Sequence, residues 1–120
     1  MIKLTNKVKC EVDYTNKFKK QLKKISKQGK NIDELFCVVE KLANYESLES
    51  KYRNHNLIND KIYKDCSECH INPDWLLVYK YLDNKLILLL VATGSHSEIF
   101  NWYCKYLNYF WFYVYSSVFS

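Results

Sequence analysis

Two stretches near the start of the chain carry apolar residues at helical spacing. The first begins at Thr15 or Asn16, both good N-cap residues, and ends near Gly29. The second follows Asn31, and Glu34 is placed as in a capping box. The apolar stripes consist of Phe18, Leu22 and Ile25 in the first stretch and of Leu35, Val38, Val39 and Leu42 in the second. This pattern predicts two amphipathic helices joined by a short turn.

Two strongly apolar stretches in the second half of the chain predict a β-hairpin. Residues 75–82 and 85–92 are rich in β-branched and aromatic residues and are separated by Asp83 and Asn84. Their near-continuous apolarity indicates strands that are covered on both faces. Weak alternation over residues 9–14 predicts one more short strand.

The remaining segments are more polar and predict connections. Residues 44–68 are dominated by Asn, Asp, Glu, Ser and Lys, which indicates a loop region with short extended pieces. Residues 93–95, Thr-Gly-Ser, are expected to end the last strand, and residues 98–100 to form a short final piece. Together these elements predict an α+β fold in which an N-terminal helical hairpin packs on a small antiparallel β-sheet.

Length and composition indicate one domain followed by an unusual tail. With 120 residues, 48% of them hydrophobic, and with two Gly and one Pro, the chain offers one core and no visible linker. Residues 101–120 are rich in aromatic residues, carry one charge and have too short an uncharged run to span a bilayer. We expect a domain over residues 1–100 and an aromatic extension that packs on the sheet, anchors at an interface or is an accident of the reading frame.

The N-terminal sequence and the cysteines bear on compartment and metal binding. The start lacks the apolar core and cleavage site of a secretory signal, and five cysteines, an odd number, agree with a reducing cytoplasm. Residues 66–70 have the CxxCH spacing of a haem attachment site, and a zinc set from Cys66, Cys69 and His70 is a second alternative. Because the sequence has no second CxxC or HxxxH pair, we expect no metal or cofactor and interpret the cysteines as packing residues.

Positive charge is concentrated near the N-terminus. The net charge is +5, but residues 1–30 hold ten Lys against two acidic residues, a net of +8, and the rest of the chain sums to −3. Such a block favours polyanionic partners, above all nucleic acid. We expect Lys19, Lys20 and Lys23 to contact phosphates; a solvated lysine-rich helix face is the alternative.

All three histidines lie beside short polar and aromatic clusters. Histidine suits acid–base chemistry near neutral pH because its unperturbed pKa is about 6.5. A hydrogen-bonded structural role is the alternative for a lone histidine that enters a strand. The candidate cluster consists of His55, His70, Asp74, Trp75, His96 and Phe100.

Two linked motifs resemble the YafQ branch of the RelE-type bacterial toxins: ECHINPDWLLVYKY at residues 68–81 and ATGSHSEIF at residues 92–100. The resemblance extends from about residue 13 to Phe100 and includes His-Asn-Leu at residues 55–57. It implies a ribosome-dependent endoribonuclease that cuts mRNA in the ribosomal A site. It also implies a DinJ-like antitoxin as partner, through which the toxin–antitoxin complex binds operator DNA, and no membrane. The family's functional positions fall on the six residues of the candidate cluster.

Metal-independent cleavage of RNA sets the roles within this cluster. It needs a base for the 2′-OH proton, an acid for the departing 5′-oxygen and positive charge near the phosphorus. We expect His70 and His96 to form the acid–base pair, in either order. Asp74 is expected to orient a histidine or act as a base, and His55 to contact the phosphate or transfer a proton.

The remaining site residues bind substrate. Trp75 and Phe100 are expected to stack on bases, with ordinary core positions as the alternative. The family usually has a basic residue three positions before the histidine of the first motif, where this chain has Ser67. Lys61 and Lys64, together with Arg53, are expected to supply the missing positive charge.

A second hypothesis explains the same sequence. The altered basic position and the aromatic tail also fit a catalytically decayed toxin that acts only as an antitoxin-binding or nucleic-acid-binding module. The histidines do not separate the two hypotheses, because a recently decayed gene keeps them. Toxicity on induction does.

Overall fold

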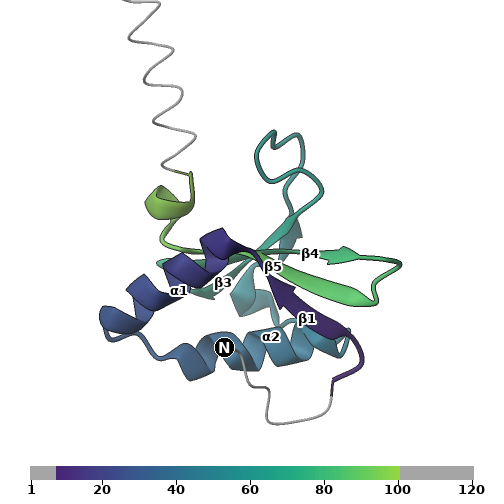
Figure 1. Ribbon diagram of the computed structural model, residues 1–120, viewed down its shortest axis with the longest axis horizontal. Helices are drawn as coiled ribbons and strands as arrows, with labels where there is room; N and C mark the ends of the chain where they lie inside the picture. Colours follow the sequence, from purple (N-terminus) through teal and green to yellow (C-terminus); the bar gives the residue numbers. More distant parts are fainter. Residues whose placement is uncertain (1–7, 101–120) are drawn as a thin grey trace, which may run out of the picture.

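The computed structural model describes residues 8–100, so the predictions for residues 101–120 lie outside the described range. Two helices pack against one five-stranded sheet, and the chain is an α+β protein (Figure 1). The elements are α1 (Asn16–Lys27), α2 (Ile32–Ala43), the short 3-10 helix η1 (Ser50–Tyr52) and the strands β1 (Glu11–Tyr14), β2 (His55–Asn56), β3 (Ser67–Asn72), β4 (Trp75–Leu82) and β5 (Ile87–Gly94).

Both predicted helices begin at their predicted caps. The Oγ1 of Thr15 accepts a hydrogen bond of 3.0 Å from the Phe18 N–H, and the Oδ1 of Asn31 accepts one of 3.1 Å from the Asp33 N–H. These bonds satisfy amide groups that have no partner within the helix. Gly29, at φ +83°, follows α1 and turns the chain toward α2.

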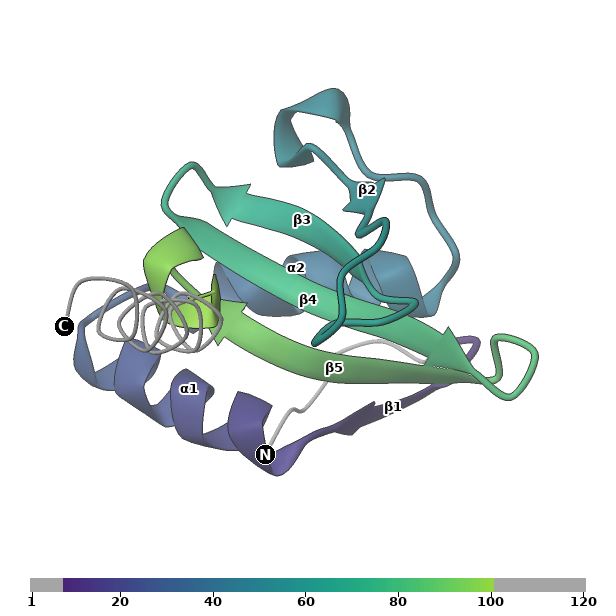
Figure 2. The same cartoon turned by 90° about the horizontal axis from the view of Figure 1, so that it is seen from above.

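The sheet has the strand order β1-β5-β4-β3-β2 (Figure 2). The pairs β2/β3, β3/β4 and β4/β5 are antiparallel, and the last of these is the predicted hairpin. The β1/β5 pair is parallel, so the sheet as a whole is mixed. A parallel pair needs a crossover connection, and here the helices and the other strands lie between β1 and β5 in the sequence.

Three local predictions are corrected by the structure. Strand β3 starts at Ser67, inside the stretch that was expected to be a loop. The β4/β5 turn occupies the four residues 83–86, not two, and Asp83, Asn84 and Lys85 all have positive φ. Strand β5 continues through Thr93 to Gly94, and residues 96–100 are helical.

Each face of the sheet has its own apolar cluster. On one face, α1 and α2 bury their stripes against Cys69, Leu77, Tyr79 and other strand residues. On the opposite face, called here the open face, Leu76 and Val78 form a second cluster with Tyr63, Cys66, Ala92 and Ile99. The segment between β2 and β3 and the last helical turn lie on this side of the sheet (Figure 1). The helices therefore support the sheet from one side and leave the other side for a site.

A β-bulge changes the side-chain alternation within β5. Val78 pairs with Ala92 and Tyr79 pairs with Leu90, which leaves Val91 as the extra residue. As a result Leu90 lies in the helix-side cluster, whereas Ala92 lies in the open-face cluster. No helix within residues 8–100 is long and apolar enough to cross a membrane.

Candidate active site

Strand pairing places two of the three histidines on the open face. His55 pairs with Glu68, and Glu68 pairs with Val78, so these side chains form a row across β2, β3 and β4. His70 is two residues beyond Glu68 on β3 and therefore points to the same side. Because Val78 belongs to the open-face cluster, His55, Glu68 and His70 lie on the side away from the helices.

Glu68 is the carboxylate that contacts a histidine. Its Oε1 lies 3.5 Å from the Nε2 of His70. Glu68 is buried, with 5% of its surface exposed, whereas the side chain of His70 retains 19%. A carboxylate beside a ring nitrogen restricts the rotation of an imidazole, so Glu68 orients the His70 side chain. Glu68 directly precedes Cys69 and His70 in the first motif, but it was not among the predicted site residues.

His55 is held by its own loop. Its Nδ1 lies 2.7 Å from the carbonyl oxygen of Arg53, which is in the left-handed region at φ +47°. A carbonyl can only accept, so Nδ1 carries the hydrogen and Nε2 remains available. Arg53 and His55 are both exposed.

His96 lies in the first turn of the helical segment at residues 96–100. Its ring contacts that of Phe100 at a centroid distance of 4.7 Å, and Phe100 contacts Tyr63 edge-on at 5.7 Å. Ile99 of the same turn is buried in the open-face cluster. The third histidine therefore reaches the side of the sheet that carries His55 and His70.

Trp75 is a core residue, and the predicted role in base stacking is corrected. Its side chain is 1% exposed, lies in the helix-side cluster and donates a hydrogen bond of 2.8 Å from Nε1 to the Oγ1 of Thr93. The Thr93 hydroxyl donates in turn to the Leu76 carbonyl oxygen at 2.8 Å. A ring enclosed in this way has no face for a nucleobase, whereas Phe100 is partly exposed.

Asp74 lies apart from the Glu68–His70 contact. It is exposed in the β3/β4 turn, where its N–H donates to the Oδ1 of Asn72 at 3.1 Å. The orienting role predicted for Asp74 therefore belongs, on this geometry, to Glu68. Asp74 stays a predicted site residue at the end of the strand that carries His70.

Lys61 and Lys64 line a cavity of about 780 Å³. Asn56, the residue that follows His55, is also part of its lining. Its other lining residues include Cys66, next to the start of β3. Ser67, which stands at the family's basic position, donates to the Oδ1 of Asn56 at 2.7 Å. Neutral groups therefore occupy this position. Lys61, Lys64 and Arg53 are the basic side chains expected to compensate, but the cavity lining also contains the carboxylates of Asp60 and Asp65.

The cysteines of the CxxCH sequence do not converge on a ligand site. Cys66 lies in the open-face cluster and Cys69 in the helix-side cluster, so the sheet separates them. Burial raises the pKa of Cys69 to about 12, as expected for a packed thiol. Within residues 8–100, no group of three or more His, Cys, Asp or Glu side chains is arranged to hold a metal ion.

Comparisons with known proteins agree with this geometry. Residues 10–101 match the family described as "Bacterial toxin of type II toxin-antitoxin system, YafQ". The mRNA interferase toxin YafQ of Escherichia coli strain B / BL21-DE3 is 29% identical over 94 residues, which are 78% of this chain and 98% of the relative.

Solved structures give the same result. A metal-bound toxin from Helicobacter pylori is 41% identical with a TM-score of 0.70, and the match covers 76% of this chain and 99% of that chain. YafQ in the E. coli DinJ–YafQ complex is 29% identical with a TM-score of 0.66, covering 76% and 98% of the two chains. The chain therefore belongs to the YafQ family of bacterial toxins from type II toxin–antitoxin systems.

Proposed function

We propose that this chain is an mRNA interferase: an endoribonuclease that cleaves mRNA in the ribosomal A site without a metal ion. The observation that carries the proposal is the convergence of His55, His70 and the buried Glu68 on one open face, with His96 reaching the same side. Relatives that match across this region bear the name mRNA interferase toxin. The cytoplasm, where ribosomes are found, is the proposed location.

The proposed reaction transfers two protons and needs no further reagent. One histidine of the pair His70 and His96 removes the 2′-OH proton, and the 2′-oxygen attacks the adjacent phosphorus. The other histidine donates a proton to the departing 5′-oxygen, which leaves a 2′,3′-cyclic phosphate and a 5′-hydroxyl. His55 presents Nε2 to the phosphate, and Arg53 and the cavity lysines balance the negative charge that develops.

The proposed partners follow from the family. E. coli YafQ is found in complex with DinJ. We therefore propose a DinJ-like antitoxin for this chain, which blocks the open face until it is removed and through which the complex binds operator DNA. The ribosome is the second partner, and Lys19, Lys20 and Lys23 are the proposed contacts with rRNA phosphates.

His70→Ala and His96→Ala test the function. Each is expected to abolish growth arrest on induction and to lower mRNA cleavage by a factor on the order of 10² to 10⁴, because one proton-transfer partner is lost. Cleavage is measured by primer extension on purified ribosomes programmed with a short mRNA. Glu46→Ala, an exposed position three residues after the end of α2, is the control.

The outcome separates the two hypotheses. If both histidine variants arrest growth like the parent at equal expression, the mechanism is wrong. If the parent itself neither arrests growth nor cleaves mRNA, the decayed-toxin hypothesis is correct. The specific observation behind that second candidate is Ser67, a neutral residue at the family's basic position, which is engaged with Asn56.

A further inference from the structure

Three polar side chains of α1 reach the segment that carries His96. They are Lys17, Gln21 and Lys24, which follow i, i+4, i+7 spacing and so lie on one face of the helix. We call this set the anchor stripe. Lys17 and Lys24 belong to the basic block of the sequence, but in the structure Lys24 contacts Glu98 of the helical turn, and Lys17 contacts Tyr63, which is bonded to that turn.

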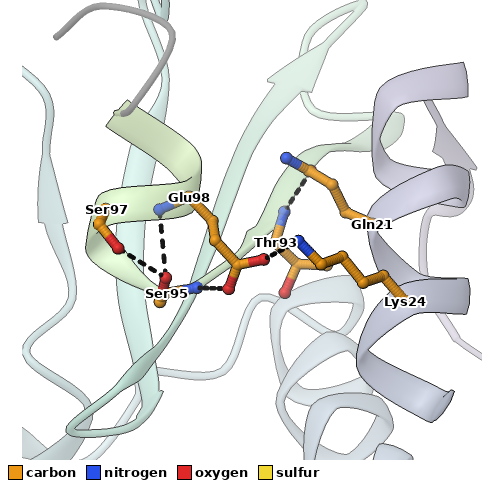
Figure 3. A network of polar contacts seen from close by, with 6 residues as sticks. All are labelled: Gln21, Lys24, Thr93, Ser95, Ser97 and Glu98. Atoms are coloured by element: carbon orange, nitrogen blue, oxygen red, sulfur yellow. Dashed lines mark hydrogen bonds and ion pairs between the residues drawn. The ribbon is translucent and has the colours of Figure 1, made fainter. Parts of the chain in front are cut away.

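The three contacts bracket His96 on both sides. Before it, the N–H of Thr93 donates to the Oε1 of Gln21 at 2.9 Å. After it, the Nζ of Lys24 lies 3.0 Å from the Oε2 of Glu98 (Figure 3). Lys17 donates to the Tyr63 hydroxyl at 2.6 Å, and that hydroxyl donates to the carbonyl oxygen of Ile99 at 2.8 Å.

A capping box connects the anchored carboxylate to the start of the turn. The N–H of Glu98 donates to the Oγ of Ser95 at 3.1 Å, and the N–H of Ser95 donates to the Oε1 of Glu98 at 3.3 Å (Figure 3). The bonds from Lys24 and Ser95 lower the pKa of Glu98, so this carboxylate is charged at neutral pH. The residue enclosed by this box, His96, therefore takes its backbone position from Ser95 and Glu98.

A glycine ends β5 just before the turn begins. Gly94 has φ +150°, a conformation that residues with a side chain rarely adopt, and it joins β5 to the helical turn. His96 itself is exposed, and its ring contacts Phe100 of the same turn. A proton donor or acceptor at such a position depends on its neighbours for the accuracy of its placement.

The energetics favour a geometric role over a stabilising one. An ion pair between exposed side chains contributes little to folding, so the Lys24–Glu98 pair adds little to the stability of the domain. Displacement of a catalytic group by roughly 1 Å, in contrast, lowers a rate by a factor on the order of 10². Contacts that are weak for folding therefore matter for catalysis.

We propose that Lys17, Gln21 and Lys24 are positioning residues that hold the turn of residues 95–99 so that His96 transfers its proton to or from the RNA. The proposal rests on the proposed function, in which His96 is one of the acid–base pair. It divides the lysines of α1 into two groups: those of the anchor stripe, which face the site, and Lys19, Lys20 and Lys23, which face outward.

The test uses the full chain with Gln21→Leu and Lys24→Met combined. The first readout is the NMR resonance of the His96 Cε1–H and its nuclear Overhauser effect to the Phe100 ring, recorded without RNA. The second is single-turnover cleavage of mRNA on programmed ribosomes. We expect the His96 resonance to shift, the contact with Phe100 to weaken and the rate at saturating toxin to fall about tenfold, while half-saturation stays within about twofold.

Three single variants sharpen the result. Lys27→Met removes the same charge from the same helix and is expected to leave both readouts unchanged. Lys24→Met changes a side chain that is 62% exposed, so it keeps the parental melting temperature and is expected to move the His96 resonance in the same direction as the double variant. Lys24→Arg keeps the ion pair and is expected to retain the parental rate.

The failures can be told apart. A double variant with the parental His96 resonance, the parental contact with Phe100 and the parental saturating rate would overturn the proposal. So would a loss of rate with the His96–Phe100 contact intact. If the parent cleaves no mRNA, the proposed function fails, and the NMR comparison still decides whether the anchor stripe positions His96.

Discussion

At the scale of single residues, the two strand histidines leave different ring nitrogens free. The Nδ1 of His55 is engaged by the carbonyl oxygen of Arg53, which leaves Nε2 for the RNA. The Nε2 of His70 is engaged by Glu68, which leaves Nδ1. The carbonyl oxygen of Arg53 thus sets the tautomer of His55, and the carboxylate of Glu68 restricts the rotation of the His70 ring. Two histidines on one sheet face can therefore take different roles in the reaction.

The residue roles were only partly predictable from the sequence. The motifs identified the histidines, but Glu68 and Asp74 are both carboxylates near His70, and only the strand register shows which one contacts it. The available signal for the role of Glu68 was its i, i+2 spacing from His70. Two residues at this spacing lie on the same face only if the segment is a strand. Trp75 was misassigned because burial depends on the tertiary fold, not on the motif.

Glu68→Gln tests the carboxylate that the structure adds to the site. The amide is nearly isosteric but uncharged, so it removes the carboxylate that orients the His70 ring, and we expect mRNA cleavage to fall by roughly 10-fold to 100-fold with the fold intact. Rates are compared with those of Asp74→Asn in the same ribosome assay. A larger loss in Asp74→Asn than in Glu68→Gln would return the orienting role to Asp74. Glu46→Gln controls for removal of an exposed carboxylate.

At the scale of elements, polar site residues in β3 interrupt the apolar alternation by which a half-buried strand is recognised in a sequence. Strand β3 reads Ser-Glu-Cys-His-Ile-Asn, and the polar residues Glu68 and His70 occupy the open face where apolar ones are expected. Its first two residues, Ser67 and Glu68, were therefore assigned to a loop. In β5 the bulge at Val91 changes the face of the following residues, and a run of apolar residues gives no sign of it. The helices were predictable because their apolar spacing and their caps agree.

The outward lysines of α1 provide a test at this scale. Reversal of Lys19, Lys20 and Lys23 to Glu is expected to weaken ribosome binding and to flatten its salt dependence, since each lost phosphate contact lowers the slope by about 0.7 to 0.9. Binding to purified ribosomes is measured as log K against log salt. The control reverses three exposed lysines on other elements, Lys9, Lys51 and Lys85, which changes the net charge equally. An equal slope in both triple variants would mean that the lysine-rich face is merely solvated.

At the scale of the whole molecule, the two faces of the sheet have different roles: one carries most of the hydrophobic core and the other carries the candidate site. The helix side carries most of the large buried side chains, so stability depends mainly on α1, α2 and the strands. The open face is covered only in part, by the smaller cluster around Tyr63 and Ile99. This layered plan was predictable from the amphipathic helices and the apolar strands. The parallel β1/β5 pair was not, because nothing in a short, weakly alternating strand specifies its neighbour.

The last prediction concerns the boundary at residue 100. We expect a chain without residues 101–120 to be soluble, to unfold cooperatively and to be at least as toxic as the full chain. Both apolar clusters close within residues 8–100, the family match ends at residue 101, and the 94 matched residues span 98% of an E. coli relative. A chain cut after residue 95 is the matched control, because it also loses His96 and the buried Ile99 and should lose toxicity. Thermal unfolding by circular dichroism, solubility and growth arrest are the measurements. An insoluble or non-cooperatively unfolding 1–100 chain would mean that the aromatic extension covers apolar surface of the domain and is part of the fold.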